Sequence, residues 1–285
     1  MTNATHPPAS TDRASRTFTM TLDINASPED VWRALTEAGE LVRWFPLQAR
    51  VTPERGGTMF WGWDEQWSWE STIETWEPGR CLTLVENRPA FDAQGNPLSM
   101  APRRMAMEFT LESDAGRTRL RIVHSGFGEG AAWDDELESV SAGWQFELRG
   151  LRHYLEHHKG RDRIHAAAHQ VTSLPQESVW KRLLSSEAFT VEPVDGSMTE
   201  GTRCVVRSST GDSFTGTIGW HNPGHDLFVV VDDLTQGVLR LCTWRAAGKT
   251  GVQVWLVTYS AAHAGRVRDF GAAVGPLLTR LLQAG

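Results

Sequence analysis

The feature that most constrains the fold is a repeated opening, in which an alternating strand leads into a short helix that carries Val-Trp. The first copy reads SPEDVWRAL from residue 27, and the second reads LPQESVWKRLL from residue 174. With one inserted residue allowed, Trp32 aligns with Trp180. Hairpin strands and a closing amphipathic helix follow both copies in the same order. Two copies of one fold are the simplest explanation of this similarity.

The first copy begins with a strand whose apolar residues alternate with polar ones. Four apolar side chains share one face of this strand, as in a half-buried sheet: Phe18, Met20, Leu22 and Ile24. Ser27 then suits a helix N-cap and Pro28 the first helical position. Turn residues separate further strands, which we predict at 47–53, 57–63, 67–76, 81–87, 105–112 and 117–124. Their spacing indicates hairpins and therefore an antiparallel sheet.

A long amphipathic helix closes each copy. Apolar residues at spacings of three and four predict the first helix over 131–157, and a similar stripe predicts the second near the end of the chain. The charged sequence KGRDR separates the two copies. We therefore expect an α+β protein with a disordered tail at 1–15, a first domain at 16–160 and a diverged second domain at 161–285. Each domain is expected to be a curved antiparallel sheet wrapped around a long C-terminal helix.

Composition excludes several classes of partner. The 285-residue chain has a net charge of -7, and no run of Lys or Arg exceeds two residues. Nucleic acid and membrane are therefore not expected as partners. Three widely spaced cysteines form neither a disulfide framework nor a zinc motif, and no apolar segment reaches membrane-spanning length. A cytoplasmic protein is expected. No glycine-rich loop opens a helix as a phosphate site requires, so we expect no cofactor and no metal.

Four tryptophans within FWGWDEQWSWE, residues 60–70, form the most unusual local pattern. If residues 64–66 form a hairpin loop, Trp63 faces Trp67 and Trp61 faces Trp69 across the ladder. All four indoles then share one face of the sheet. Continued alternation adds Ser71, Ile73 and Thr75 to this face, while acidic residues occupy the opposite one. The tryptophans are therefore predicted to point inward.

Whether this inward surface is a filled core or a hollow remains open from the sequence. Four indoles and two methionines are bulky enough to fill the space beneath a helix. Tryptophan is seldom buried completely, however, because its N–H needs a hydrogen-bond partner. An aromatic-walled pocket with donor groups would satisfy both properties.

The motifs of the first half resemble those of a known superfamily. They are SPEDVWRALTEAGELVRWF, then ERGG at 54–57, HSGF at 124–127 and GW at 143–144. Together they resemble the SRPBCC superfamily, the helix-grip fold of START and Bet v 1-like proteins. The most similar branch is the activator of heat-shock protein 90 ATPase homologue domain. The resemblance covers residues 16–158, whereas the second half keeps the layout but lacks ERGG, HSGF and GW.

This resemblance implies a seven-stranded antiparallel sheet gripping the C-terminal helix, with two short helices and a cavity between them. Relatives in the superfamily include lipid carriers, hormone receptors, polyketide cyclases and oxygenase subunits, so the fold alone does not determine function. Carried onto this chain, the resemblance implies a cavity lined by Trp44, Trp61, Trp63, Trp67, Trp69, Met107, Phe109, His124 and Trp144.

The leading hypothesis is therefore binding of a small apolar, aromatic molecule by the first domain. One alternative is an enzyme of the cyclase, dehydratase or hydrolase type, with His124 as acid–base, because alternation directs this histidine inward. Another is a chaperone-interacting protein, and a protein partner or a homodimer is left open. His153 and His157 are expected on a solvated helix end. Residues 89–104 form either a lid or an unstructured connection, and the second domain is expected to have a smaller or filled interior.

Overall fold

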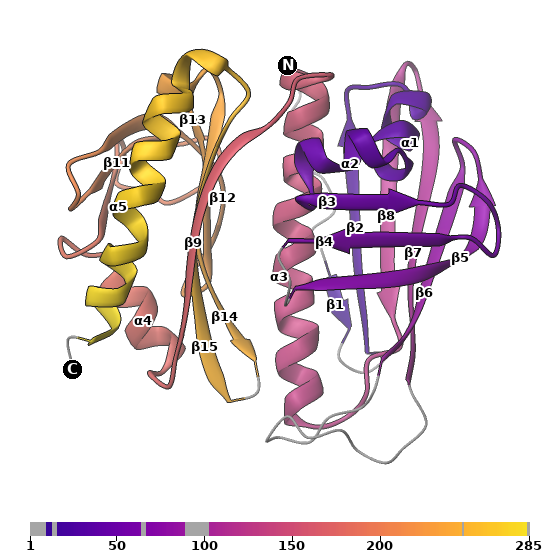
Figure 1. Ribbon diagram of the computed structural model, residues 1–285, viewed down its shortest axis with the longest axis horizontal. Coiled ribbons are helices and arrows are strands. Elements are labelled where there is room, and N and C mark those ends of the chain that lie inside the picture. Colours follow the sequence, from indigo (N-terminus) through magenta and orange to yellow (C-terminus); the bar gives the residue numbers. More distant parts are fainter. Residues whose placement is uncertain (1–9, 13–15, 64–66, 89–102, 247, 284–285) are drawn as a thin grey trace. The chain divides into compact units, whose positions relative to one another are not determined.

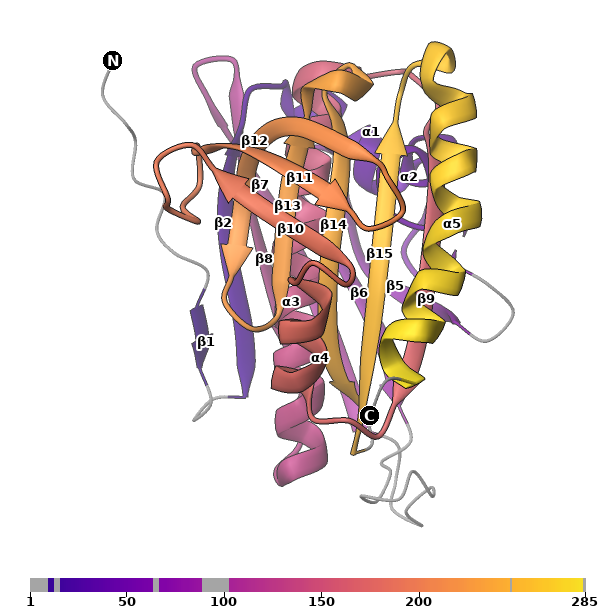
Figure 2. The same ribbon diagram turned by 90° about the vertical axis from the view of Figure 1, so that its left-hand side faces the viewer.

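The computed structural model describes residues 10–12, 16–63, 67–88, 103–246 and 248–283. The chain divides into two compact units, Met1–Arg161 and Asp162–Gly285, here called the first and second domains. Each contains an antiparallel sheet followed by a long helix (Figures 1 and 2), so the predicted pair of helix-grip domains is confirmed. The hairpin loop at 64–66 and most of the 89–104 segment lie outside the described residues.

The first domain has eight strands in the order β1-β2-β8-β7-β6-β5-β4-β3. Its strands are β1 (Ser10–Asp12), β2 (Thr17–Ile24), β3 (Gln48–Val51), β4 (Thr58–Gly62), β5 (Ser68–Glu77), β6 (Cys81–Arg88), β7 (Arg103–Asp114) and β8 (Arg117–Ser125). Its helices are α1 (Pro28–Thr36), α2 (Ala38–Trp44) and α3 (Ala131–His153). The strand β1 is an addition, because the sequence predicted no structure before residue 16.

The first short helix begins at the position that its capping residues in the sequence predicted. Ser27 accepts a hydrogen bond from the backbone N–H of Asp30 at 3.2 Å, and Pro28 occupies the first turn of α1. A single residue, Glu37, separates α1 from α2. Trp44 at the end of α2 donates its indole N–H to the carbonyl of Ala34 at 2.9 Å. This bond fixes the angle between the two helices.

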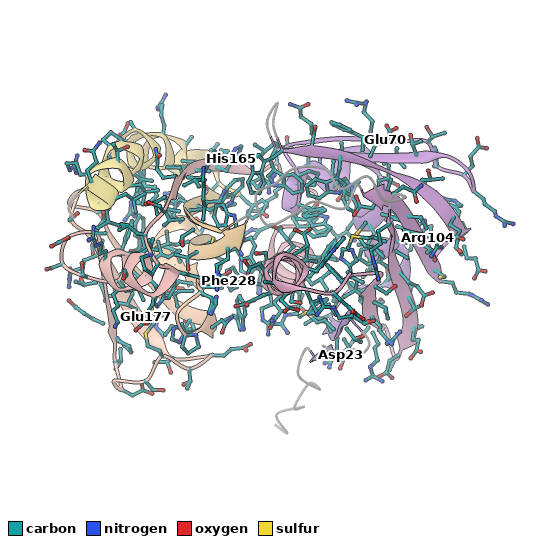
Figure 3. All side chains as sticks on the ribbon, turned by 90° about the horizontal axis from the view of Figure 1, so that it is seen from below. Asp23, Glu70, Arg104, His165, Glu177 and Phe228 are labelled. Atoms are coloured by element: carbon teal, nitrogen blue, oxygen red, sulfur yellow. The ribbon has the colours of Figure 1, made fainter. Side chains whose placement is uncertain are left out.

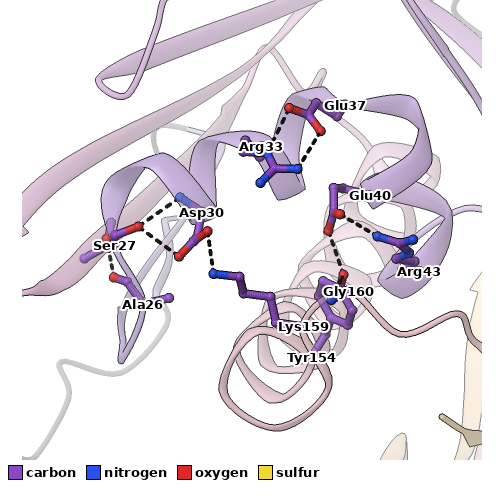
Figure 4. A network of polar contacts seen from close by, with 11 residues as sticks. Ala26, Ser27, Asp30, Arg33, Glu37, Glu40, Arg43, Tyr154, Lys159 and Gly160 are labelled. Carbon is purple, nitrogen blue, oxygen red and sulfur yellow. Dashed lines mark hydrogen bonds and ion pairs between the residues drawn. The ribbon is translucent and has the colours of Figure 1, made fainter.

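The C-terminal end of α3 is fastened to these short helices. The helix continues into one π-helical turn, Tyr154–His158. Figure 4 shows the Tyr154 hydroxyl donating to Glu40 at 2.6 Å and accepting from the backbone N–H of Gly160 at 2.9 Å. Lys159 also pairs with Asp30 at 2.7 Å. These contacts hold one end of α3 in place over the sheet.

The ERGG motif forms a turn that is hydrogen-bonded to β5. Gly56 has a φ of 84°, in the left-handed region that favours glycine. A Cβ on Gly57 would lie only 2.2 Å from the backbone oxygen of Thr52, so no side chain fits there. The N–H of Gly56 donates to Ile73, and the N–H of Ile73 donates to Gly57, both at 2.8 Å. The motif is therefore explained by backbone packing.

The second domain has seven strands in the order β10-β11-β12-β13-β14-β15-β9. The strands are β9 (Ile164–Thr172), β10 (Phe189–Pro193), β11 (Arg203–Ser208), β12 (Ser213–Asn222), β13 (Asp226–Val231), β14 (Gly237–Ala246) and β15 (Lys249–Thr258). The helices are α4 (Gln176–Leu183) and α5 (Ala264–Gln283), with short 3-10 turns at Asp232–Leu234 and Ala261–His263. Strand β10 was not among the sequence predictions.

Apolar side chains make up the buried core of the second domain. Its buried core includes Phe214, Ile218, Leu239 and Leu241, packed with Phe270 of α5. The alanine-rich strand β9 lets α5 approach closely, because a Cβ added to Gly271 would lie 2.7 Å from Ala166. Small residues on both elements therefore permit this contact.

Two irregularities correct the predicted alternation. In β5 the pairing with β6 shifts between Ile73 and Thr75, so Thr75 pairs with Thr83 and leaves the inward face. In β12 the pairing with β13 shifts between Ile218 and Trp220, so Trp220 does not share the face of Ile218. One extra residue reverses every later side chain in a strand. Both shifts lie in corresponding strands, which extends the similarity between the two copies.

Candidate functional site

The inner face of the first sheet, which is packed against α3, carries most of the predicted site. Burial alternates along β7, with Met105, Met107, Phe109 and Leu111 all buried. His124 on β8 pairs with Met107 on one side and Phe18 on the other. Glu70 and Arg104, labelled in Figure 3, lie on the outer face. The sheet therefore separates an apolar interior from a charged exterior.

Seven aromatic residues of the first domain pack together, and we call them the aromatic cluster: Trp44, Phe45, Trp61, Trp63, Trp69, Phe109 and Trp144. Phe45 lies at its centre, with ring centroids 5.1 Å from Trp44, 4.9 Å from Trp61 and 5.4 Å from Trp144. Trp63 stacks on Trp69 at 4.9 Å. Edge-to-face and offset contacts at these distances are the favourable ones for aromatic rings.

Trp67 corrects the prediction that all four tryptophans point inward, because it is an exposed residue. Its residue is 47% exposed, although its carbonyl accepts the predicted cross-strand hydrogen bond from the N–H of Trp63 at 2.8 Å. The ladder ends at Gly62 and Ser68, so Trp67 lies outside the regular pleat that directs alternate side chains inward. Trp61 and Trp69 do pair within the ladder, as predicted.

Two polar atoms in this interior have no hydrogen-bond partner among the described residues. They are the indole Nε1 of Trp61 and the hydroxyl Oγ of Ser71. The two residues are 2% and 1% exposed. Ser71 pairs with Met59, two positions from Trp61 along β4, so both side chains lie on the same face of adjacent strands. The interior therefore offers one N–H donor and one hydroxyl close together.

His124 is held by a hydrogen bond from Trp144. The indole Nε1 of Trp144 donates to Nδ1 of His124 at 3.1 Å, and both residues are buried. Because an indole N–H can only donate, Nδ1 must accept, and the neutral imidazole carries its proton on Nε2. The ring of Phe127 lies 4.9 Å from that of His124. This histidine presents a donor N–H at Nε2 in its neutral form.

Glu86 is a site residue that the sequence reading missed. It is 7% exposed and follows Leu82 and Leu84 at the alternating spacing of β6, on the inner face. Extending the period-two pattern along 81–87 would have found it. The inner face of the sheet therefore includes a carboxylate. Phe45 was also missed, because it follows α2 and belongs to no periodic pattern.

The histidines at the end of α3 differ from expectation. His153 and His158 are buried, whereas His157 is exposed, so the predicted solvated surface is only partly correct. The ring centroids of His153 lie 4.9 Å from His157 and 5.1 Å from His158, because the π turn brings the three rings onto one side. Within the described ranges, no group of three or more His, Cys, Asp or Glu residues is arranged to hold a metal.

No described helix is both long and apolar enough to cross a membrane. All three cysteines are free. Burial raises the pKa of the Cys204 thiol above its usual value, which keeps that side chain a poor nucleophile.

Comparison with known proteins places the first domain in a family. Residues 25–156 match the family described as Activator of Hsp90 ATPase homolog 1-like protein. No curated protein matches the chain significantly.

Several solved structures are similar to part or all of the chain. A protein from Mesorhizobium loti is 23% identical over 50% of this chain and 97% of its own, with a TM-score of 0.42. The Aha1 dimer from Colwellia psychrerythraea is 20% identical over 50% and 98%, with a TM-score of 0.41. The di-domain ARO/CYC BexL from the BE-7585A biosynthetic pathway is 15% identical over 95% and 99%, with a TM-score of 0.40.

Proposed function

Residues 25–156 form a domain of the Activator of Hsp90 ATPase homolog 1-like family, and we propose that this domain binds a small, mainly apolar molecule with an aromatic ring and an oxygen acceptor. The molecule lies between the sheet and α3, against the aromatic cluster. Its oxygen accepts hydrogen bonds from Trp61 and Ser71.

The observation that carries this proposal is the pair of buried polar atoms without partners. Leaving a buried donor or acceptor unsatisfied costs on the order of 1–3 kcal/mol per group. Trp61 Nε1 and Ser71 Oγ both bear this cost on adjacent strands of one sheet face. A carbonyl or phenolic oxygen would satisfy both groups at once. A protein that only filled its core would be more stable with phenylalanine and alanine at these positions.

The surrounding rings support an aromatic ligand. Trp61 contacts Trp69 edge-to-face at 6.1 Å and Trp144 at 6.3 Å. Aromatic pairs prefer centroid distances of roughly 4.5–7 Å. A planar ligand beside Trp61 would add further contacts of the same kind. Met59 and Met107 on the same face are flexible enough to adjust around it.

An acid–base enzyme is less well supported by the contacts of His124. Trp144 occupies Nδ1, so a carboxylate cannot orient the imidazole through that atom as in a catalytic pair. Only Nε2 can face a ligand, and in the neutral ring it donates. His124 is therefore proposed as a binding residue. A chaperone-interacting role would instead depend on exposed residues and would be indifferent to Ser71.

The test compares two probes that differ in one oxygen. Acetophenone carries a carbonyl acceptor, and ethylbenzene has nearly the same shape without it. Titration calorimetry with the whole chain is expected to show saturable binding of acetophenone and weaker binding of ethylbenzene. Ser71→Ala should lower the affinity for acetophenone by about tenfold, which is the loss expected for one buried hydrogen bond. The affinity for ethylbenzene should be unchanged.

The matched control is Thr72→Ala, the next residue on β5, whose side chain is exposed on the outer face. It should bind both probes as the unmodified chain does. The proposal fails if neither probe binds, or if Ser71→Ala and Thr72→Ala bind acetophenone equally well.

A further inference from the structure

Arg16, which precedes β2, is partly buried and uses only some of its N–H donors among the described residues. Arg16 donates from Nη1 to the carboxylate of Asp134 in the first turn of α3. Its side chain is 15% exposed. The atoms Nε and Nη2 are fully buried, and neither has a hydrogen-bond partner among the residues that the structure describes. A buried guanidinium with two unused donors is costly and calls for a physical explanation.

The geometry of the unused donors identifies what they can bind. The N–H groups of Nε and Nη2 lie along one edge of the planar guanidinium and point in the same direction. Two parallel donors at this spacing match the two oxygens of a carboxylate, in the bidentate arrangement typical of arginine. We propose that this edge of Arg16 binds the carboxylate of a small organic acid. Asp134 holds the other side of the guanidinium and fixes its orientation.

The charges around Arg16 favour a singly charged anion. Asp134, Asp135 and Glu136 all lie near the start of α3. Their negative charges oppose a second negative charge on the ligand more strongly than a first. On the favourable side, Arg103 bonds to the backbone carbonyls of Gly126 and Phe127, in the connection that leads to α3. A monocarboxylate should therefore bind better than the phosphate dianion.

The backbone at Arg16 supports a specific role for this residue. Its φ is 54°, in the left-handed region that residues other than glycine rarely adopt. Strained positions of this kind are concentrated at binding sites, where the surrounding structure holds them. Here the pairing of Thr17 with Ser125 fixes the chain immediately after Arg16. The strain and the unsatisfied edge therefore occur at the same residue.

This site is separate from the ligand site proposed above. Arg16 precedes β2, whereas Trp61 and Ser71 lie on β4 and β5, and three strands stand between in the sheet order. The proposal of a carboxylate site therefore does not depend on the proposed function, and an experiment can contradict either one without contradicting the other.

The experiment titrates the whole chain with acetate, benzoate, benzamide and phosphate while the arginine Nε–H signals are followed by NMR. Acetate and benzoate are expected to shift the Arg16 signal saturably, benzamide to leave it unchanged, and phosphate to bind more weakly. This readout uses the unmodified chain and does not depend on a variant folding. Arg16→Lys should lower the affinity for acetate and for benzoate by at least about tenfold, because an ammonium group cannot offer the parallel pair of donors.

Arg121→Lys is the matched control, because Arg121 is exposed on the outer face of β8. It should bind carboxylates as the unmodified chain does. The proposal is overturned if neither carboxylate shifts the Arg16 signal, if phosphate binds more tightly than acetate, or if Arg16→Lys retains full affinity. Binding of benzoate without acetate, weakened by Ser71→Ala, would place the carboxylate in the aromatic interior and would also overturn it.

Discussion

The indole of Trp144 donates a hydrogen bond to His124 across 3.1 Å, between the long helix α3 and strand β8. The bond joins the GW motif to the HSGF motif, which stand 20 residues apart in the chain. It is a polar link between helix and sheet inside an apolar interior. Its contribution can be measured because each partner has an apolar replacement of similar shape.

Trp144→Phe should lower the free energy of unfolding by about 1–3 kcal/mol beyond the lost indole packing, because it leaves Nδ1 of His124 buried without its donor. The double variant Trp144→Phe, His124→Leu should recover part of this loss. Urea denaturation of both single variants and of the double variant gives the coupling energy. Strictly additive losses would show that the hydrogen bond contributes nothing.

Trp67 and Trp69 provide a matched pair of substitutions on one strand end. Trp67→Leu should change the free energy of unfolding by less than Trp69→Leu does, because about half of Trp67 is already exposed to solvent. Trp69→Leu should cost roughly 2–4 kcal/mol, since it removes the stacking on Trp63 and the edge contact with Trp61. Chemical denaturation measures both. Equal losses would mean that the two indoles are packed alike.

Alanine substitutions at Gly57 and Gly143 should change the free energy of unfolding in opposite directions. At Gly57 the new Cβ would lie 2.2 Å from the Thr52 oxygen, and the required backbone shift should cost about 1–3 kcal/mol. At Gly143, within α3, the new Cβ would meet no heavy atom within 4 Å apart from its chain neighbours and the adjacent backbone of the helix itself. Alanine there should stabilise the domain by roughly 0.5–1 kcal/mol, through reduced backbone entropy of the unfolded chain. Thermal denaturation of both variants tests the pair, and a stabilised Gly57→Ala would contradict the observed turn.

Tyr154 predicts a loss of stability at alkaline pH. Burial, followed by its hydrogen bond to Glu40, raises the pKa of the Tyr154 hydroxyl from 10.0 to about 12. Because the folded pKa is the higher one, the stability contributed by this group is complete below pH 10. It declines as the pH rises towards 12, by up to roughly 1.4 kcal/mol per pH unit.

Absorbance near 295 nm can follow this ionisation, because the chain has only two tyrosines. Tyr154→Phe should remove the transition near pH 12 and flatten the alkaline decline in stability, although it also weakens the contact between α3 and α2. If the variant loses stability above pH 10 as steeply as the unmodified chain, the decline has another origin.

The sequence predicted the repeat, the order of the main strands and the buried faces of β2, β7 and β8, because these depend on alternation over many residues. It failed where one residue changes the pattern. The bulge between Ile73 and Thr75 moves every later side chain of β5 to the other face, and no composition signal marks it. The inward position predicted for Trp67 was wrong because the regular pairing of β5 with β4 begins only at the next residue, Ser68.

The site was predicted less completely than the fold. Trp61 and Trp69 come together as the alternation implied, and Phe109 and Trp144 join them as the resemblance implied. Phe45 joins them from a connection between α2 and β3, where the chain direction depends on tertiary packing. The bond between Trp144 and His124 also depends on how α3 is placed over the sheet, which periodicity along either element does not specify.

The pairing of β2 with β8 affects the order in which the chain can acquire structure. Phe18 lies opposite His124, and in the second domain Ile164 lies opposite Thr258, so each first strand meets its partner only after about 100 further residues. At a synthesis rate of roughly 5–20 residues per second, the first strand waits on the order of 5–20 s on the ribosome without that partner. Contacts so distant in sequence also slow folding in solution. Each copy must therefore be nearly complete before its sheet can close.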